Sequence, residues 1–311
     1  MANIRPLSED LQKVAETELS EVPKRIPDDL LALKTWIEQQ PHLKARQDDQ
    51  FLIQYLRGSK YSLEKAKTKL DIFFTLKSKF PDLFNVTDIN DARFKKIYSY
   101  GFGLPLLRPL NDHGPRIFFV NFEDDIVHGQ FDVPELFWVV NAMHEIIIMD
   151  DPYGCINGMI YIWDLKNISL NMAAKFTPSF LRKMVQFYDK SLPFRIKSLH
   201  MFNTPPFFHS VLNILIPLLS EKLKKRLFVY GHNLDDLQKN IPKKYLPAYL
   251  GGENGTKEEL LKNFDQKWLE YKDYFKENEN YGTEELLRPG KPIDFDSIYG
   301  LGGSFRKLDV D

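Results

Sequence analysis

The chain has 311 residues and a formal net charge of -1, with 42 Lys and Arg against 43 Asp and Glu. This length suits one large domain or two modest ones, and the balanced charge gives no overall field that would favour nucleic acid as a partner. The single cysteine, Cys155, excludes an intramolecular disulfide framework and suits a reducing compartment.

The N-terminal sequence is charged throughout and lacks the apolar core of a secretory signal. No window reaches the ~20 apolar residues that a membrane-spanning helix needs. We therefore expect a soluble, cytoplasmic protein. Its 24 phenylalanines and 14 tyrosines are more than a compact core needs, and they fit a cavity lined with aromatic side chains.

The first part of the chain has a helical pattern. Helix starts are predicted at Ser8, Pro27, Asp48 and Ser62, where capping or acidic residues precede stripes of apolar residues. The sequence therefore predicts an all-α helical bundle as a first domain, residues 1–90.

From about residue 115 the period changes to that of an α/β protein. Four short apolar runs alternate with helical segments of crossover length: RIFFVNF (116–122), GMIYIWDL (158–165), RIKSLHMFN (195–203) and RLFVYG (226–231). This alternation predicts a mostly parallel sheet flanked by helices. We expect the α/β domain to span residues 91–275, with residues 276–311 as a C-terminal tail that wraps or frays.

The segment from Pro205 to Arg226 is unusually apolar in its middle, Phe207–Leu219. It is too short to span a bilayer. Each large apolar side chain gains ~1.5–3 kcal/mol on full burial, so such a helix is unstable in water. The sequence leaves three roles open: a core helix, a helix in a membrane surface, or one that alternates between the two.

Signatures of an enzyme or a metal site are incomplete. His144-Glu145 begins like the zinc motif H-E-x-x-H, but Ile148 stands where the second histidine would be. The seven histidines show no metal spacing, and no nucleophile has a recognisable partner. We therefore predict no catalytic residues, no metal and no cofactor. A hydrolase acting on lipid esters would need a Ser–His pair that the sequence does not locate.

Four basic residues lie where a parallel sheet brings them to one edge. Arg195 and Lys197 are i, i+2 at the start of the third predicted strand, and Lys222 and Arg226 are i, i+4 after the apolar helix. The crossover returns that helix end to the start of the next strand, so the four cations can converge on a phosphorylated headgroup. The alternative is that they are solvated side chains complementing a helix C-terminus.

Four stretches of the chain follow a known pattern: DDQFLIQYLRGSKYSLEKA (48–66), GMIYIWDL (158–165), SLPFRIKSLHMFNTPPFFHSVLNILIPLLSEKLKKRLFVYG (191–231) and YLPAYLGGE (245–253). Together they resemble the CRAL-TRIO lipid-binding family, most closely its alpha-tocopherol transfer protein group and that group's insect relatives. The resemblance covers roughly residues 25–275. It implies a helical N-terminal domain and an α/β domain that holds one hydrophobic ligand in a closed cavity. A mobile lid helix, about residues 206–219, would cover that cavity.

Carried over position by position, the resemblance also implies site residues. In that group, two basic residues before the lid and two after it bind phosphatidylinositol phosphates. The corresponding residues here are Arg195, Lys197, Lys222 and Arg226. The implied lining of the pocket is Phe137, Val140, His144, Ile160, Ile162, Phe176, Phe187, Leu192, Phe194, Phe207, Val211, Leu212 and Leu215. Val140 and His144 replace two serines that lie near the tocopherol head, a departure that puts tocopherol itself in doubt. Retinoid, carotenoid, sterol-like and phospholipid cargo stay open.

The resemblance thus predicts a monomeric lipid-transfer protein that carries one hydrophobic ligand and exchanges it at phosphoinositide-containing membranes. Such a protein would be cytoplasmic and peripheral at membranes, with no nucleic-acid partner and no cofactor other than the bound lipid. The alternative is a phosphoinositide-sensing signalling or scaffold module without diffusible cargo.

Overall fold

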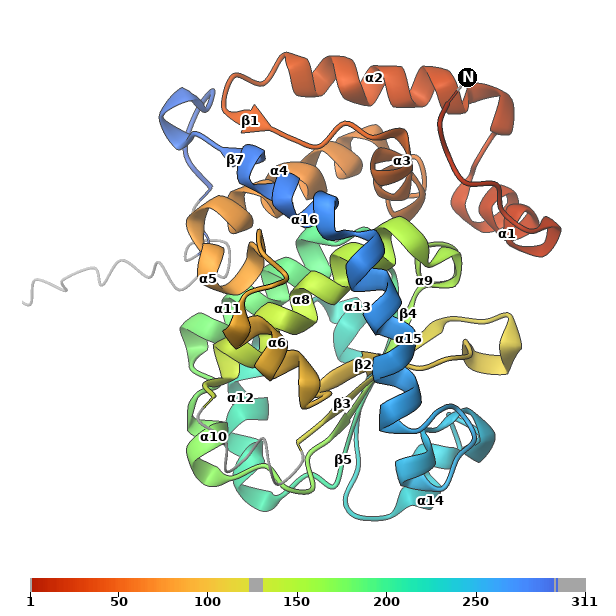
Figure 1. Cartoon of the computed structure of the whole chain (residues 1–311), viewed down its shortest axis with the longest axis vertical. Helices are drawn as coiled ribbons and strands as arrows, with labels where there is room; N and C mark the ends of the chain where they lie inside the picture. The colour runs from red at the N-terminus through yellow and green to blue at the C-terminus, as the bar shows by residue number, and fades with distance from the viewer. Residues whose placement is uncertain (1, 123–130, 294, 296–311) are drawn as a thin grey trace, which may run out of the picture.

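The computed structural model describes residues 2–122, 131–293 and 295 of the chain. Figure 1 shows the N-terminal helices at the top and a sheet with its flanking helices below them. The four predicted N-terminal helices are present as α1 (Glu9–Leu19), α2 (Ile26–Glu38), α3 (Asp49–Gly58) and α4 (Leu63–Lys79). The central one is α3, because its residues from Phe51 to Arg57 are all buried.

A five-stranded sheet forms the centre of the α/β part, in the order β2-β3-β4-β5-β6. The strands are β2 (Gly103–Pro105), β3 (Arg116–Asn121), β4 (Met159–Asp164), β5 (Ile196–Phe202) and β6 (Leu227–Val229). The pairs from β3 to β6 are parallel, which confirms the predicted sheet. The antiparallel edge strand β2 was not predicted, since three residues carry too little periodicity.

Helices pack on both sides of this sheet (Figure 1). The α/β region and the segments that flank it contain these helices: α5 (Pro81–Phe84), α6 (Ala92–Ser99), α8 (Val133–Asp150), α9 (Pro152–Asn157), α10 (Leu170–Ala174), α11 (Pro178–Val185), α12 (His209–Leu218), α13 (Glu221–Lys224), α14 (Leu234–Gln238), α15 (Lys257–Glu270) and α16 (Lys272–Glu277). Asp132 and Glu135 form a capping box at the start of α8, with Pro134 in its first turn. This cap fixes the first turn of the helix that forms one wall of the site described below.

The described part of the predicted tail is attached to the helical region. Strand β7 (Gly282–Thr283) pairs antiparallel with β1 (Leu43–Lys44), and Arg288 forms an ion pair with Asp71 of α4. Tail residues 294 and 296–311 lie outside the described residues. Buried apolar side chains run without interruption across the predicted boundary at residue 90, and the domain limits stay a prediction.

A buried ion pair joins the helical region to α8. The Lys77 amine on α4 lies 2.7 Å from a carboxylate oxygen of Glu145 on α8, and both side chains are 1% exposed. Tyr274 and Asn278 donate hydrogen bonds to the same carboxylate, at 3.1 and 3.2 Å. Burial lowers the pKa of the Lys77 amine, and the charge of Glu145 opposes that effect. This four-residue network fixes α8 against the N-terminal helices and α16.

Replacement of Lys77 by methionine should destabilise the protein strongly. The Lys77→Met variant leaves Glu145 buried without its cation, so the free energy of unfolding should fall by about 3–5 kcal/mol. The matched control is Lys67→Met, which removes an ion pair with the exposed Glu64 and should change stability by less than about 1 kcal/mol. Urea denaturation measures both, and equal effects would contradict the assignment.

Candidate lipid-binding site

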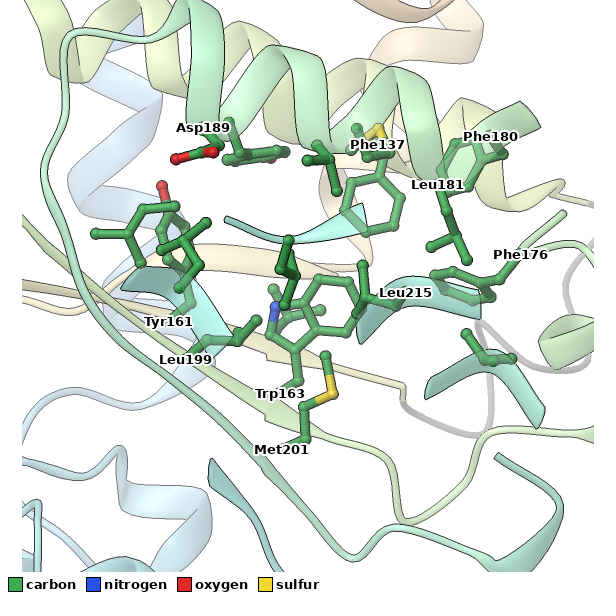
Figure 2. A pocket seen from close by; sticks show the side chains of 18 of the residues that line it. Phe137, Tyr161, Trp163, Phe176, Phe180, Leu181, Asp189, Leu199, Met201 and Leu215 are labelled. Atoms are coloured by element: carbon green, nitrogen blue, oxygen red, sulfur yellow. The ribbon is translucent and has the colours of Figure 1, made fainter. Parts of the chain in front are cut away.

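An apolar cavity lies between one face of the sheet and helices α8, α11 and α12 (Figure 2). About 100 Å³ inside it can hold the centre of a water molecule, and the space free of protein atoms is about 910 Å³ when the opening to solvent is included. The lining residues are Phe118, Val120, Phe137, Val140, Tyr161, Trp163, Phe176, Phe180, Leu181, Met184, Val185, Tyr188, Asp189, Ile196, Leu199, Met201, Phe208, Val211, Leu215, Leu219 and Leu223. This lining suits a hydrophobic molecule.

The floor of the cavity consists of side chains in register across three strands. Phe118 pairs with Tyr161, which in turn pairs with Leu199, and the next row on the same face is Val120, Trp163 and Met201. Side chains on a strand alternate between the two faces. The register therefore places two rows of large apolar groups side by side under the helices.

One wall of the cavity is α11 together with the π-helix η3 (Gln186–Ser191) that continues it. Leu181, Met184, Val185 and Tyr188 line the cavity at the i, i+3, i+4, i+7 spacing of one helix face. Asp189 follows in the π-helical turn and also lines the cavity. Such turns often occur at functional sites.

The other wall is α12, which follows the short 3₁₀ helix η4 (Pro206–Phe208). Val211 and Leu215 face the cavity, whereas Ile216 is 38% exposed on the outer side. Within the residues that the structure describes, the only side-chain hydrogen bond of α12 runs from the Ser210 hydroxyl to the Phe207 carbonyl, at the start of the helix itself. Among these residues, the side chains of α12 therefore contact other elements through apolar groups alone.

Five of the thirteen predicted pocket residues line this cavity: Phe137, Val140, Phe176, Val211 and Leu215. The predicted Ile160 and Ile162 do not. They alternate with Tyr161 and Trp163 on β4 and therefore point to the opposite face of the sheet, where both are buried. An apolar run buried on both faces gives no alternation from which the correct face can be chosen.

The other six predicted residues lie near the cavity but do not line it. His144 lies behind Tyr161, and Phe194 lies beside His144 at 6.1 Å between ring centroids. Phe187 stacks on Phe84 of α5 at 4.6 Å between centroids, and the Leu192 carbonyl accepts a hydrogen bond from Lys69 of α4 at 2.6 Å. In η4 the residue that lines the cavity is Phe208 and not Phe207, and Leu212 is buried outside the lining.

Sequence reasoning missed most of the floor and the α11 wall. The missed lining residues are Phe118, Val120, Tyr161, Trp163, Phe180, Leu181, Met184, Val185, Tyr188, Asp189, Ile196, Leu199, Met201, Phe208, Leu219 and Leu223. The helical period through Leu181, Met184 and Tyr188 would have identified the wall. For the floor, only the strand register decides.

His144 holds the hydroxyl of a cavity tyrosine. Its Nδ1 lies 2.7 Å from the Val140 carbonyl, and its Nε2 lies 3.0 Å from the Tyr161 hydroxyl. The side chain is fully buried, and burial lowers its pKa to about 4. The ring is therefore neutral at physiological pH. Because a carbonyl only accepts, the ring hydrogen is on Nδ1, and Nε2 accepts from Tyr161.

The four predicted cations lie near one another at the edge of the sheet where β5 and β6 begin. The Arg195 guanidinium donates to the Ile156 carbonyl and lies 3.3 Å from the Glu18 carboxylate, and Arg226 donates to the Ile196 carbonyl. Partial burial lowers the pKa of the Lys197 amine, and the nearby charge of Arg195 lowers it further. Burial and then the charges of Arg226 and Arg195 lower the pKa of the Lys222 amine. Lys222 is exposed, so part of this positive charge faces solvent.

A Ser–His hydrogen bond that the sequence did not locate lies away from the cavity. Ser198 and His200 are i, i+2 on β5, with 2.8 Å between the hydroxyl oxygen and Nε2. The other ring nitrogen, Nδ1, lies 3.1 Å from the Tyr230 hydroxyl, where a catalytic triad would have a carboxylate. Ser198 and His200 alternate with the floor residues Leu199 and Met201 and therefore belong to the opposite face of the sheet.

The α/β part of the chain matches a known family. The profile described as CRAL/TRIO domain matches residues 106–252, which include the sheet from β3 to β6, helix α12 and the four cations. The chain carries a CRAL/TRIO domain. The resemblance predicted from the sequence is thereby confirmed, and CRAL/TRIO proteins bind lipophilic ligands and transfer them.

Relatives that match about four fifths of the chain agree with this domain. Alpha-tocopherol transfer protein-like from Homo sapiens is 28% identical over 250 residues, which are 80% of this chain and 72% of that protein. Clavesin-2 from Rattus norvegicus is 29% identical over 249 residues, which are 79% of this chain and 75% of that protein. CRAL/TRIO relatives are lipid-transfer proteins and generally not enzymes.

Two further comparisons concern the fold. The crystal structure of Sfh5 superposes with a TM-score of 0.50 at 12% identity, covering 86% of this chain and all of that one, so the likeness is one of fold alone. A second profile, described as Pinta-like, UBA domain, matches residues 22–94 in the helical region. None of the described helices combines the length and the apolar character that a membrane crossing requires.

The buried His144 predicts a pH dependence of stability. Its pKa is about 4 in the folded CRAL/TRIO domain and about 6.5 in an unfolded chain. Between these values the unfolded state binds a proton that the folded state does not, so lowering the pH from 6.5 to 4 reduces the free energy of unfolding. The loss from this group should be on the order of 3 kcal/mol.

Urea denaturation at pH 7 and pH 4.5 measures this loss. His144→Phe should lose less stability between the two pH values than the wild type. The control His113→Phe, at an exposed histidine, should follow the wild type. An unchanged pH dependence in His144→Phe would contradict the assignment.

Proposed function

We propose that this protein carries one hydrophobic lipid in the cavity under α12 and exchanges it at phosphoinositide-containing membranes. The observation that supports it most is an apolar cavity covered by α12, a helix whose side chains make only apolar contacts with the other described elements. Moving this lid breaks no side-chain hydrogen bond to another described element. The apolar side of α12 can therefore exchange the cavity for the apolar region of a bilayer.

Arg195, Lys197, Lys222 and Arg226 are the proposed headgroup site. Their mutual proximity lowers the pKa of both lysines, after the effect of partial burial. The carboxylates of Glu18 and Asp189 oppose the repulsion among these like charges, and an anionic phosphate would relieve it further. Near an anionic membrane each such cation adds about 1 kcal/mol of attraction.

The cavity and the headgroup site share a neighbour. Asp189 lines the cavity, and its negative charge raises the pKa of Lys222 against the effects of burial and the nearby arginines. A phosphate that binds near Lys222 would repel this carboxylate at the cavity wall. Arrival at the membrane can thus change the environment of the cargo, provided that the open state binds the headgroup better.

A carrier should retain its cargo during purification. Native mass spectrometry of the purified protein should show one lipid per chain, which incubation with liposomes exchanges or depletes. A chain that never contains lipid, neither as purified nor after incubation with liposomes, would contradict the carrier function. It would favour the alternative of a phosphoinositide-sensing module without cargo.

The headgroup site predicts a specific loss of membrane binding. Lys222→Ala with Arg226→Ala should weaken binding to liposomes that contain phosphatidylinositol phosphates by about 2 kcal/mol, or roughly thirty-fold. Lys224→Ala with Lys225→Ala removes the same charge from neighbouring positions and should have a much smaller effect. Sedimentation with liposomes measures the membrane binding of both double variants. Equal losses of binding would contradict a specific headgroup site and would indicate only general attraction between the protein's positive charge and the membrane.

A further inference from the structure

Polar side-chain atoms of the cavity gather at one end of it. Figure 2 shows the hydroxyl of Tyr161 and the carboxylate of Asp189 at the same end. Tyr188, which also lines the cavity, packs edge-on against Tyr161 with 5.6 Å between the ring centroids. This polar end consists of the side chains of Tyr161, Tyr188 and Asp189.

The hydroxyl hydrogen of Tyr161 is already used in a hydrogen bond within the protein. The Val140 carbonyl fixes the hydrogen of His144 on Nδ1, so Nε2 is left as an acceptor at 3.0 Å from the Tyr161 oxygen. Tyr161 therefore donates away from the cavity, to the histidine. Its phenol oxygen keeps only acceptor capacity for a ligand.

A second relay of the same kind commits the hydrogen of Tyr188. The Asn141 amide nitrogen donates to the Leu83 carbonyl at 2.9 Å, which orients the amide group. The amide oxygen of Asn141 then lies 2.9 Å from the Tyr188 hydroxyl and accepts from it. Each relay ends at a backbone carbonyl, so neither tyrosine can reverse its hydrogen bond without leaving a buried group unpaired.

Asp189 completes the polar end with a further acceptor. Its Oδ2 is buried and accepts no hydrogen bond from any residue that the structure describes. The amine of the adjacent Lys190 lies 2.8 Å from this oxygen, as an ion pair without hydrogen-bond geometry. The described lining has one indole N–H, on Trp163, whose backbone position lies two residues, or roughly 6.5 Å, further along β4 than that of Tyr161.

We propose that the polar end selects a lipid with a hydroxyl group, which donates its hydrogen to Tyr161, Tyr188 or Asp189. An ether, ester or carbonyl oxygen placed there would find no donor among these three side chains and would lose hydrogen bonds to water. The inference rests on the proposed carrier function and narrows its cargo to lipophilic alcohols.

Two isomeric probes test this selection, 1-hexadecanol and methyl pentadecyl ether. Both have one oxygen and a flexible chain that adapts to an apolar cavity, and hydrophobicity alone favours the ether. Each probe competes with diphenylhexatriene, a fluorescent hydrocarbon without hydrogen-bonding groups, for the purified, lipid-depleted protein. The alcohol should displace it at about ten-fold lower concentration than the ether.

Variants then locate the selecting groups. In Tyr161→Phe and in Tyr188→Phe the ratio of the two affinities should fall toward one. In His144→Leu the Tyr161 hydroxyl loses its acceptor and can donate into the cavity, so the preference should shift toward the ether. The control is Tyr98→Phe, which removes a hydroxyl bonded to the Leu261 carbonyl outside the cavity lining and should keep the wild-type ratio. Circular dichroism checks that each variant folds. The comparison of the two probes on the wild-type protein does not depend on any variant.

The outcomes separate this inference from the carrier function. Equal displacement by the two probes overturns the selection of a hydroxyl and leaves the carrier intact. An ether that binds better than the alcohol in the wild type overturns it as well. Failure of the reporter and of both probes to bind contradicts the carrier function itself, and the inference falls with it.

Discussion

The structure depends on one face of the sheet, whose apolar side chains must be shielded from water although the space above them is not filled with protein atoms. Two rows of large side chains lie on this face under α8, α11 and α12. Phe118, Tyr161 and Leu199 form one row, and Val120, Trp163 and Met201 form the other. Exposure of such rows to water is unfavourable by about 25 cal/mol for each Å² of apolar surface. The helices shield them but leave a cavity, whose lining lacks contacts on one side. A hydrophobic ligand supplies those contacts, so its binding should stabilise the closed fold.

The two walls of the cavity are attached in different ways. Helix α8 is anchored by a buried network in which Lys77, Tyr274 and Asn278 all contact Glu145. Breaking it would leave charges unpaired at low dielectric. Helix α12 has no comparable polar attachment among the described residues. Opening at α12 therefore needs only the exchange of one apolar environment for another, whereas opening at α8 would disrupt the core.

Features with a strong period or a fixed topology could be predicted from the sequence. The four parallel strands were found because their apolar runs alternate with helices. The segment Phe207–Leu219 stood out because its composition fits neither water nor a membrane span, but its role as a lid was implied only by the family resemblance. The convergence of Arg195 and Lys197 with Lys222 and Arg226 followed from the crossover geometry. That deduction needs only the direction of the strands and no side-chain detail.

What could not be predicted has definite physical causes. Strand β4 is apolar on both faces, so periodicity could not decide between Ile160 and Tyr161, and only the register with β3 and β5 does. The short pairs of β1 with β7 and of β2 with β3 are set by contacts distant in sequence. His144 was expected in the lining, but it stands behind Tyr161, because a buried histidine needs partners for both nitrogens.

The placement of the four cations bears on how α12, the proposed lid, could move. Arg195 and Lys197 are fixed at the start of β5, whereas Lys222 belongs to α13, directly after the lid. A phosphate bound between them would tie α13 to the sheet. Leu219 and Ser220, both in extended conformation between α12 and α13, are then the nearest points at which the backbone can bend. Pro217 already removes one donor from the last turn of α12. Headgroup binding would thus confine opening to α12, which precedes this bend in the sequence. The cations would stay in place while the apolar side of α12 leaves the cavity.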